Sequence, residues 1–200
     1  MIRSLIAVCV FALVAAGQTA APPVELPAEP GLYAIFDTSM GPIVAQLFED
    51  KAPLTVKNFV ALASGTKASA NAAGAMVRKH YYDGLTFHRV IKGFMIQTGD
   101  IRGTGTSNCG IPNLRDEIDP DLKFDTVGRL AMANTGAPNT AACQIFITVG
   151  KPAYLNGKYT IFGQVVVGQD IADKISLVPT ANEKPVLPVR VKSVTIRRKQ

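Results

Sequence analysis

The fold is decided by residues 87–100, which read Phe87-His88-Arg89-Val90-Ile91-Lys92-Gly93-Phe94-Met95-Ile96-Gln97-Thr98-Gly99-Asp100. Two short apolar runs flank Gly93, and this pattern predicts two strands joined by a tight turn. Arg89 and Gln97 lie on these strands together with the Phe94-Met95 pair. Arginine on a half-buried strand is uncommon unless it is paired or has a function, and no carboxylate is adjacent to Arg89 here. We therefore expect a groove that binds an apolar ring and places a charged donor beside it.

The length of 200 residues suits one domain with a substantial core, and the composition is that of a globular protein without tryptophan. Lysine and arginine number 21 against 15 acidic residues, which gives a formal net charge of +6. These charges are scattered, apart from a basic run at residues 197–199. We interpret that run as a solvated tail, and so we predict no nucleic-acid partner.

Residues 1–17 predict a signal peptide. Arg3 gives a charged start, and residues 5–16 form an apolar run that is short for a membrane span. An uncleaved membrane anchor is the alternative, and the short, alanine-rich run argues against it. Cleavage after Ala16 or Gly17 would fit the small residues there. We expect an exported protein, periplasmic or secreted, with no stable membrane insertion after cleavage. Residues 18–31, rich in proline and alanine, predict an extended tether, followed by one domain over residues 32–200.

Many short strands and two helices are expected in that domain. The first helix starts at Pro53, has an apolar face and ends at Gly65, and the second covers residues 170–176. Asn156-Gly157 predicts a hairpin turn. The irregular residues 101–125 are expected to be functional, and residues 66–79 to be a surface loop. Besides the hairpin within residues 87–100, strands are expected at residues 32–37, 43–48, 128–134, 144–149, 159–167 and 189–197. This pattern predicts an antiparallel barrel or a sandwich.

Covalent and metal-dependent chemistry lacks support in the sequence. There is no Gly-x-Ser-x-Gly motif, and the two histidines, His80 and His88, have no metal-ligand spacing with Asp83. The glycine-rich residues 99–105 lack the lysine and the helix start of a phosphate-binding loop. A hydrolase or nuclease built on these residues is thus unsupported, and a non-covalent groove remains, for which we predict no cofactor and no metal.

Several blocks of this sequence resemble the cyclophilin family of peptidyl-prolyl isomerases, in the family's order and with nearly its spacing. The blocks are residues 87–100, 130–134, 138–140, 144–147, 155–158 and 161–163, and the resemblance extends over residues 32–197. It implies an all-β fold, an eight-stranded antiparallel β-barrel capped by two α-helices, that acts on Xaa-Pro bonds. The implied partners are proline-containing peptides and unfolded exported proteins, and a monomer is expected.

The resemblance also implies roles for individual residues. Arg89 corresponds to the catalytic arginine, and Gln97 and Asn134 correspond to groups that hold the peptide backbone during catalysis. The implied substrate-binding residues are Phe94, Met95, Gly103, Ala133, Thr135, Gln144, Phe146, Tyr154, Leu155 and Tyr159. Among these, Phe94, Met95, Phe146 and Leu155 are the implied proline pocket, and Gly103 is expected to border the neighbouring subsite.

Three positions depart from the family pattern. Tyr154 stands where many eukaryotic members carry tryptophan, which predicts weak cyclosporin binding with isomerase activity retained. Tyr159 stands where histidine is frequent, and its aromatic ring can still form a wall of the pocket. The segment Gly136-Ala137-Pro138 carries one extra residue, which is expected to reshape the loop after Asn134.

Cys109 and Cys143 remain after the predicted cleavage. From the residues alone, both a disulfide bond and two buried thiols fit. By the resemblance, both cysteines fall near the two loops that border the subsite beside the proline pocket, and there we expect a disulfide.

Two functions from different classes compete. One is a prolyl isomerase that assists the folding of exported proteins. The other is a peptide-binding or chaperone module whose isomerase activity is incidental. The presence of Arg89 together with Phe94, Met95, Gln97 and Phe146 favours the enzyme.

Overall fold

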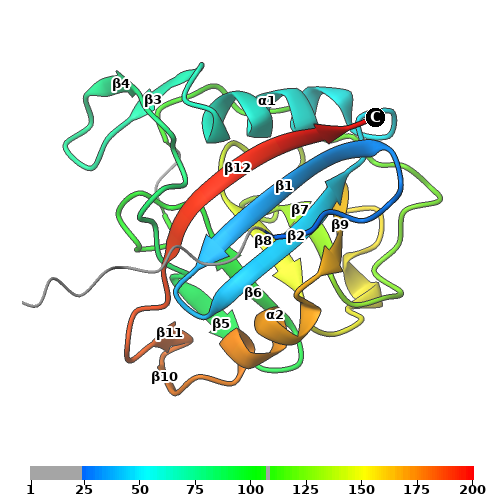
Figure 1. Cartoon of the computed structure of the whole chain (residues 1–200). Coiled ribbons are helices and arrows are strands. Elements are labelled where there is room, and N and C mark those ends of the chain that lie inside the picture. Colours follow the sequence, from blue (N-terminus) through cyan, green and yellow to red (C-terminus); the bar gives the residue numbers. More distant parts are fainter. Residues whose placement is uncertain (1–23, 107–108) are drawn as a thin grey trace, which may run out of the picture.

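The computed structural model describes residues 24–106 and 109–200. The predicted signal peptide and the first residues of the predicted tether lie outside the described residues. The strands of the main sheet are β1 (Gly31–Thr38), β2 (Gly41–Leu47), β5 (Arg89–Ile91), β6 (Met95–Thr98), β7 (Arg129–Met132), β8 (Ile145–Thr148), β9 (Ile161–Val167) and β12 (Val191–Lys199). They form one eight-stranded sheet in the order β12-β1-β2-β9-β7-β8-β6-β5, in which every pairing is antiparallel. The sheet curls into a barrel-like shell (Figure 1), which confirms the predicted fold class and decides for the barrel over the sandwich.

The two end strands of this sheet are joined by the residues that flank them. The segment before β5 bonds to the segment that begins β12: Phe87 N donates to the Val189 carbonyl at 3.0 Å, and Gly84 N donates to the Val191 carbonyl at 2.8 Å. An isolated antiparallel bridge between Thr86 and Arg190 lies between these two contacts. The last segment of the chain is therefore fastened to the segment that leads into β5.

Helices α1 (Pro53–Ala63) and α2 (Gln169–Ser176), both of which the sequence predicts, lie at opposite ends of the shell (Figure 1). Proline suits the first turn of α1 because its missing N–H would have no intrahelical partner. The free amides of Leu54 and Thr55 donate to the two carboxylate oxygens of Glu117 at 3.0 and 2.8 Å. Gly65 follows the helix with φ +69°, which confirms the predicted left-handed end.

The register of the strands separates an inner core from an outer apolar cluster. Val90, Ile96, Ile147 and Leu130 lie opposite one another on four adjacent strands and belong to the main core. Because side chains alternate along a strand, the residues next to these point outward. A second, smaller cluster forms there from Met95, Phe124, Ala131, Phe146, Leu155 and Ile161.

Residues 66–79 are not a plain surface loop, so that prediction is wrong. They contain the hairpin of β3 (Ala68–Ala70) and β4 (Met76–Arg78). The Asn71 side chain closes its turn by accepting hydrogen bonds from Ala73 N and Ala75 N, each at 3.0 Å. The alanine-rich sequence has no apolar alternation that would have indicated these strands.

Asn156-Gly157 does not form a hairpin turn, which corrects a second prediction. The pair follows a 3-10 helix, η1 (Ala153–Leu155), and the Lys158 amide donates to the Leu155 carbonyl at 3.1 Å. Strands β8 and β9 on either side do not pair with each other, because β9 pairs with β2 and β7. The dipeptide encodes a tight turn, whereas contacts distant in sequence decide which strands pair.

The described end of the predicted tether packs against the sheet. Val24 and Leu26 contact a small apolar cluster on the outer face of β1 and β2. The Tyr33 hydroxyl donates to the Glu29 carbonyl at 2.8 Å, and Lys199 Nζ donates to the Pro27 carbonyl at 2.7 Å. Residues 24–30 are thus attached to β1, the first strand of the domain, and to β12, its last strand.

Candidate active site

A row of side chains crosses the outer face of the sheet at the predicted site. Arg89 on β5 pairs with Gln97 on β6, Gln97 pairs with Phe146 on β8, and Phe146 pairs with Ala131 on β7. Residues directly opposite in adjacent antiparallel strands share a face, with Cβ atoms about 4.5–5.5 Å apart. The strand register therefore sets a guanidinium, an amide and an aromatic ring side by side.

A cavity of about 250 Å³ opens over this row. Its floor is apolar, because Met95, Phe146 and Leu155 are buried members of the outer cluster. Its lining residues are Arg89, Phe94, Met95, Gln97, Gly105, Ala133, Asn134, Phe146, Leu155 and Tyr159. An apolar floor with a charged and amide rim fits a small apolar ring that is part of a polar peptide backbone.

Aromatic contacts hold the floor in place. Phe146 stacks on Phe124 with ring centroids 5.9 Å apart, and Tyr159 meets Phe146 edge-on at 5.8 Å. Tyr154 does not line the cavity: it is 65% exposed and packs against Phe94 at 6.0 Å. Tyr159 thus forms a wall of the pocket, while Tyr154 supports its rim from outside.

The polar groups of the site bond to one another and to nearby loops. Gln97 Nε2 donates to Gln144 Oε1 at 2.9 Å, and Gln144 Nε2 donates to the Gly105 carbonyl at 3.1 Å. The Asn134 side chain donates to the Lys158 carbonyl at 3.0 Å and accepts from Gly136 N at 2.9 Å. Both polar atoms of the Asn134 amide therefore hold the loop in shape.

A second cavity of about 400 Å³ adjoins the first. Both are lined by Gln97, Gly105, Ala133 and Asn134, so they form one continuous groove. Its further lining residues are Thr106, Thr135, Thr140, Ala142, Cys143 and Gln144. The predicted Thr135 and Gln144 are thus part of the groove, and the loop with the extra residue supplies Thr135 and Thr140 to it.

A disulfide bond joins Cys109 and Cys143, as expected, with Cα atoms 6.4 Å apart. Cys143 lines the second cavity, and Cys109 is buried behind it. The bond links the loop that follows Gly105 to the residue before Gln144.

Gly103 lies in a third cavity and not in this groove. The buried Asp100 carboxylate accepts hydrogen bonds from the backbone amides of Arg102 at 2.8 Å and Thr104 at 3.0 Å, which folds this loop tightly. As a result Gly105, two residues further on, borders both parts of the groove. The implied place of Gly103 beside the neighbouring subsite is therefore taken by Gly105.

Arg89 has a carboxylate partner, which corrects the expectation that none is adjacent. Its Nε donates to Glu183 Oε2 at 2.6 Å, from a residue 94 positions later in the chain. The sequence around Glu183 carries no motif that would have indicated this contact. Gly105, Thr106, Thr140 and Ala142 are further groove residues that the sequence analysis missed.

The two histidines lie outside the groove. His80 is exposed, with Nδ1 3.9 Å from Asp83 Oδ2. His88 is buried, and burial lowers its pKa, an effect that Asp100 opposes and Arg89 reinforces. Within residues 24–106 and 109–200, no group of three His, Cys, Asp or Glu side chains could hold a metal ion, and no helix is long and apolar enough to cross a membrane.

The fold and the site together define a class of protein: an antiparallel barrel with a groove on its outer face that has an apolar floor and a polar rim. The chain belongs to the cyclophilin family, because the model of the family described as "Cyclophilin type peptidyl-prolyl cis-trans isomerase/CLD" matches residues 33–196. It is therefore a cyclophilin-type peptidyl-prolyl cis-trans isomerase.

Named relatives agree with this assignment. The chain is 47% identical to peptidyl-prolyl cis-trans isomerase A of Mycobacterium tuberculosis, over 82% of this chain and 91% of that protein. It is 43% identical to peptidyl-prolyl cis-trans isomerase B of Streptomyces anulatus, over 82% and 96%. A crystal structure of a Cryptosporidium parvum cyclophilin determined in the presence of the dipeptide Ala-Pro matches with a TM-score of 0.73 and 33% identity, over 84% of this chain and 99% of that one.

Proposed function

We propose that this isomerase is exported, that it assists the folding of exported proteins, and that Arg89 drives catalysis by stabilising the twisted amide of an Xaa-Pro bond. The observation that carries the catalytic part is the strand register, which sets Arg89 in line with Gln97 and Phe146 at the rim of an apolar pocket. Proline-containing peptides are the substrates, in keeping with the Ala-Pro dipeptide named for the Cryptosporidium parvum structure.

The chemical task is rotation about a partly double C–N bond, over a barrier of about 18–20 kcal/mol. Uncatalysed exchange at Xaa-Pro takes tens to hundreds of seconds. An enzyme speeds the reaction only through interactions that are stronger in the transition state than in either planar form. In the twisted amide, the proline nitrogen becomes pyramidal and regains a lone pair that can accept a hydrogen bond.

Arg89 suits this task because a guanidinium stays charged and offers several donors in a fixed plane. A donor directed at the proline nitrogen bonds to the twisted form and not to the planar one, in which the lone pair is delocalised. Phe146, Met95 and Leu155 hold the ring while the preceding carbonyl rotates. No covalent intermediate is required, and no bond other than hydrogen bonds forms or breaks.

The rest of the groove holds the flanking peptide and so reduces the entropic cost of reaching the transition state. The Gln97 amide lies on the wall shared by the two cavities, and the Gln144 amide bonded to it lines the second cavity. Since the Asn134 side chain is used to shape its own loop, we assign substrate contact at Asn134 to its backbone groups. Ala133 and Thr135 extend this wall.

The catalytic role is tested by the isomerisation rate of an Xaa-Pro peptide with wild-type protein and with Arg89→Ala. We expect kcat/KM to fall by about 100-fold or more, by analogy with the loss of one preorganised donor. Wild-type kcat/KM in a folded Arg89→Ala variant would contradict the role. A variant without turnover that still suppresses aggregation of unfolded clients would instead support the peptide-binding module.

Export is supported by the signal-like residues 1–17 and by the disulfide, since such bonds persist in oxidising compartments. The test is to determine the N-terminus of the protein recovered from the periplasm or the medium of its host. We expect cleavage after Ala16 or Gly17. Full-length protein retained in the cytoplasm would contradict export and leave the isomerase activity untouched.

A further inference from the structure

We propose that Glu183 is a positioning residue for catalysis, which orients the guanidinium of Arg89 toward the groove. This inference rests on the proposed catalytic role of Arg89. The carboxylate oxygen Oε2 of Glu183 accepts a hydrogen bond from Arg89 Nε at 2.6 Å. The side chains of Arg89 and Glu183 are 42% and 50% exposed, so the contact lies at the open rim of the site.

The backbone brings Glu183 to this place through a short hairpin. Strands β10 (Thr180–Ala181) and β11 (Lys184–Pro185) pair with Ala181 opposite Lys184, which leaves Asn182 and Glu183 as a two-residue turn. The Glu183 carbonyl accepts a hydrogen bond from Val90 N at 2.7 Å. The turn is therefore fastened to β5 at the residue next to Arg89, and the side chain of the same glutamate reaches Arg89 itself.

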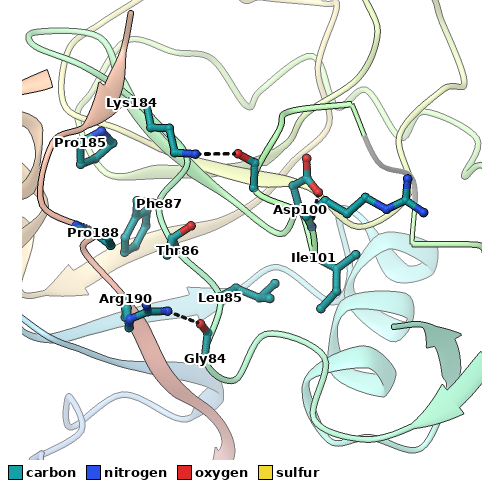
Figure 2. Close-up of a pocket in the computed structure, with 12 residues that line it drawn as sticks. Gly84, Leu85, Thr86, Phe87, Asp100, Ile101, Lys184, Pro185, Pro188 and Arg190 are labelled. Atoms are coloured by element: carbon teal, nitrogen blue, oxygen red, sulfur yellow. Dashed lines mark hydrogen bonds between the residues drawn. The ribbon is translucent and has the colours of Figure 1, made fainter. Parts of the chain in front are cut away.

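The segment that follows is fastened to the opposite wall of a third cavity of about 270 Å³ (Figure 2). Figure 2 shows the side chains of Lys184 and Arg190 at this cavity. Lys184 Nζ donates to the Gly103 carbonyl at 3.5 Å, and Arg190 Nη1 donates to the Gly84 carbonyl at 3.4 Å. Pro185 between them is buried. The turn is held to β5 through the Glu183 carbonyl, and the chain after it is held at Gly103 and Gly84, so the Glu183 carboxylate is presented from a fixed segment.

The conformation of the turn also points to a use for the side chain. Asn182 and Glu183 both have positive φ, +50° and +63°. Two-residue hairpin turns of this kind favour Asn-Gly, because glycine adopts positive φ without a steric cost. Glutamate at the second position is strained, and strain of this kind is concentrated at functional sites. The contact with Arg89 gives the side chain a role that glycine could not supply.

The hydrogen bond has a simple physical effect on the catalytic group. A free arginine side chain samples many rotamers, and fixing one of them has an entropic cost. With Nε held by Glu183, the plane of the guanidinium is fixed while its two terminal nitrogens remain for the substrate. Exposed ion pairs contribute little to folding stability. We therefore expect Glu183 to affect turnover far more than the melting temperature.

Glu183→Gly is the sharpest test, because it removes the carboxylate and relieves the strained backbone at once. We expect kcat to fall by about tenfold, as misplacement of a catalytic group predicts, with KM within about twofold of wild type. The melting temperature should stay equal or rise. Glu183→Gln, which keeps an oxygen acceptor without the charge, should retain more activity than Glu183→Gly.

Glu49→Ala is the matched control. Glu49 also binds an arginine, Arg198, through two hydrogen bonds of 2.9 and 2.8 Å, and its side chain is 43% exposed. We expect this variant to keep wild-type kcat. The NMR signal of the Arg89 Nε–Hε group should move and broaden in Glu183→Gly and remain unchanged in Glu49→Ala, a readout that a change in stability alone would not alter.

The outcomes separate this inference from the proposed function. An inactive Arg89→Ala together with a fully active Glu183→Gly would overturn the role of Glu183 and leave that of Arg89 intact. A further loss when Glu183→Gly is added to Arg89→Ala would also overturn it, because the glutamate would then act other than through Arg89. A fully active Arg89→Ala would overturn the proposed function and this inference with it.

Discussion

Gln97 on β6 donates a hydrogen bond to Gln144, the residue before β8, with Nε2 and Oε1 2.9 Å apart. Gln144 in turn donates to the Gly105 carbonyl at 3.1 Å. Gln97 and Gly105 line both cavities of the groove, and Gln144 lines the second. This chain of amides therefore marks the boundary between the proline pocket and the neighbouring part of the groove, and it couples the shape of one to the other.

Gln144→Ala should break this chain at its centre. We expect kcat/KM for an Xaa-Pro peptide to fall by about 3- to 10-fold, since one neutral hydrogen bond contributes about 0.5–1.5 kcal/mol. Gln144→Glu is the comparison, because it keeps the acceptor for Gln97 while it loses the donor to Gly105 and adds a negative charge there. Steady-state kinetics of both variants checks this, and equal losses in the two would show that the Gln97 contact is unimportant.

Phe146→Ala should harm both stability and binding. Phe146 is 4% exposed and packs between Phe124 and Tyr159, and truncation of a buried phenylalanine costs about 3–5 kcal/mol. Phe94→Ala, at the more exposed rim, should weaken peptide binding with a smaller loss of stability. Thermal unfolding and KM measured on the two variants check the contrast. Equal stability losses would argue against Phe146 as the buried floor.

The domain should lose stability on mild acidification because of His88. Burial lowers the pKa of His88 below its ordinary value of 6.5, with Asp100 opposing this and Arg89 and Lys184 adding to it. As the pH falls, the unfolded chain therefore binds a proton at this histidine before the folded protein does. The contribution of His88 to the free energy of unfolding is complete above about pH 6.5 and decreases as the pH falls below that value. The measurement is the urea midpoint between neutral pH and about pH 5, and His88→Gln should flatten its decline.

Carboxylates contribute in a different pH window. Hydrogen bonds from Lys51, Arg129 and Lys174 lower the pKa values of Asp119, Asp125 and Asp170 below their ordinary 3.8. Their contribution to stability is lost only as the pH falls through about 4 and below. An unchanged decline between pH 7 and 5 in His88→Gln would therefore count against the role given to His88.

Reduction of the Cys109–Cys143 bond should lower the free energy of unfolding by about 3–4 kcal/mol on the chain-entropy model. The bond closes a segment with a sequence separation of 34. Urea unfolding with and without a reductant measures this, and a Cys109→Ala/Cys143→Ala variant should match the reduced protein and show no response to reductant. A midpoint that is the same in both conditions would contradict the expectation.

The sequence predicted the parts of the fold that depend on local pattern. The strands β5 and β6, the start of α1 at Pro53 and its end at Gly65 follow from alternation, helical spacing and residues that favour caps. The resemblance placed Arg89, Gln97 and Phe146, and the strand register explains why they meet. The predictions of these strands and of this helix succeeded because neighbouring residues carry the information.

The missed features depend on contacts between distant segments. Glu183 reaches Arg89 across 94 positions, and its turn carries glutamate where a recognisable hairpin would carry glycine. The hairpin predicted at Asn156-Gly157 was wrong, because a turn signal does not specify which strands pair. The resemblance implied that Gly103 borders the neighbouring subsite, whereas the Asp100 carboxylate folds that loop and Gly105 borders the groove.

The central claim is that Arg89 lowers the barrier of a bound Xaa-Pro bond and does not merely help to bind it. The most direct measurement is NMR exchange spectroscopy of an Xaa-Pro peptide saturated with enzyme, which gives the cis–trans exchange rate on the protein separately from affinity. For Arg89→Ala we predict a bound exchange rate about 100-fold lower than in wild type, with the dissociation constant changed only a few-fold. An unchanged exchange rate on the variant, with weaker binding, would contradict the claim.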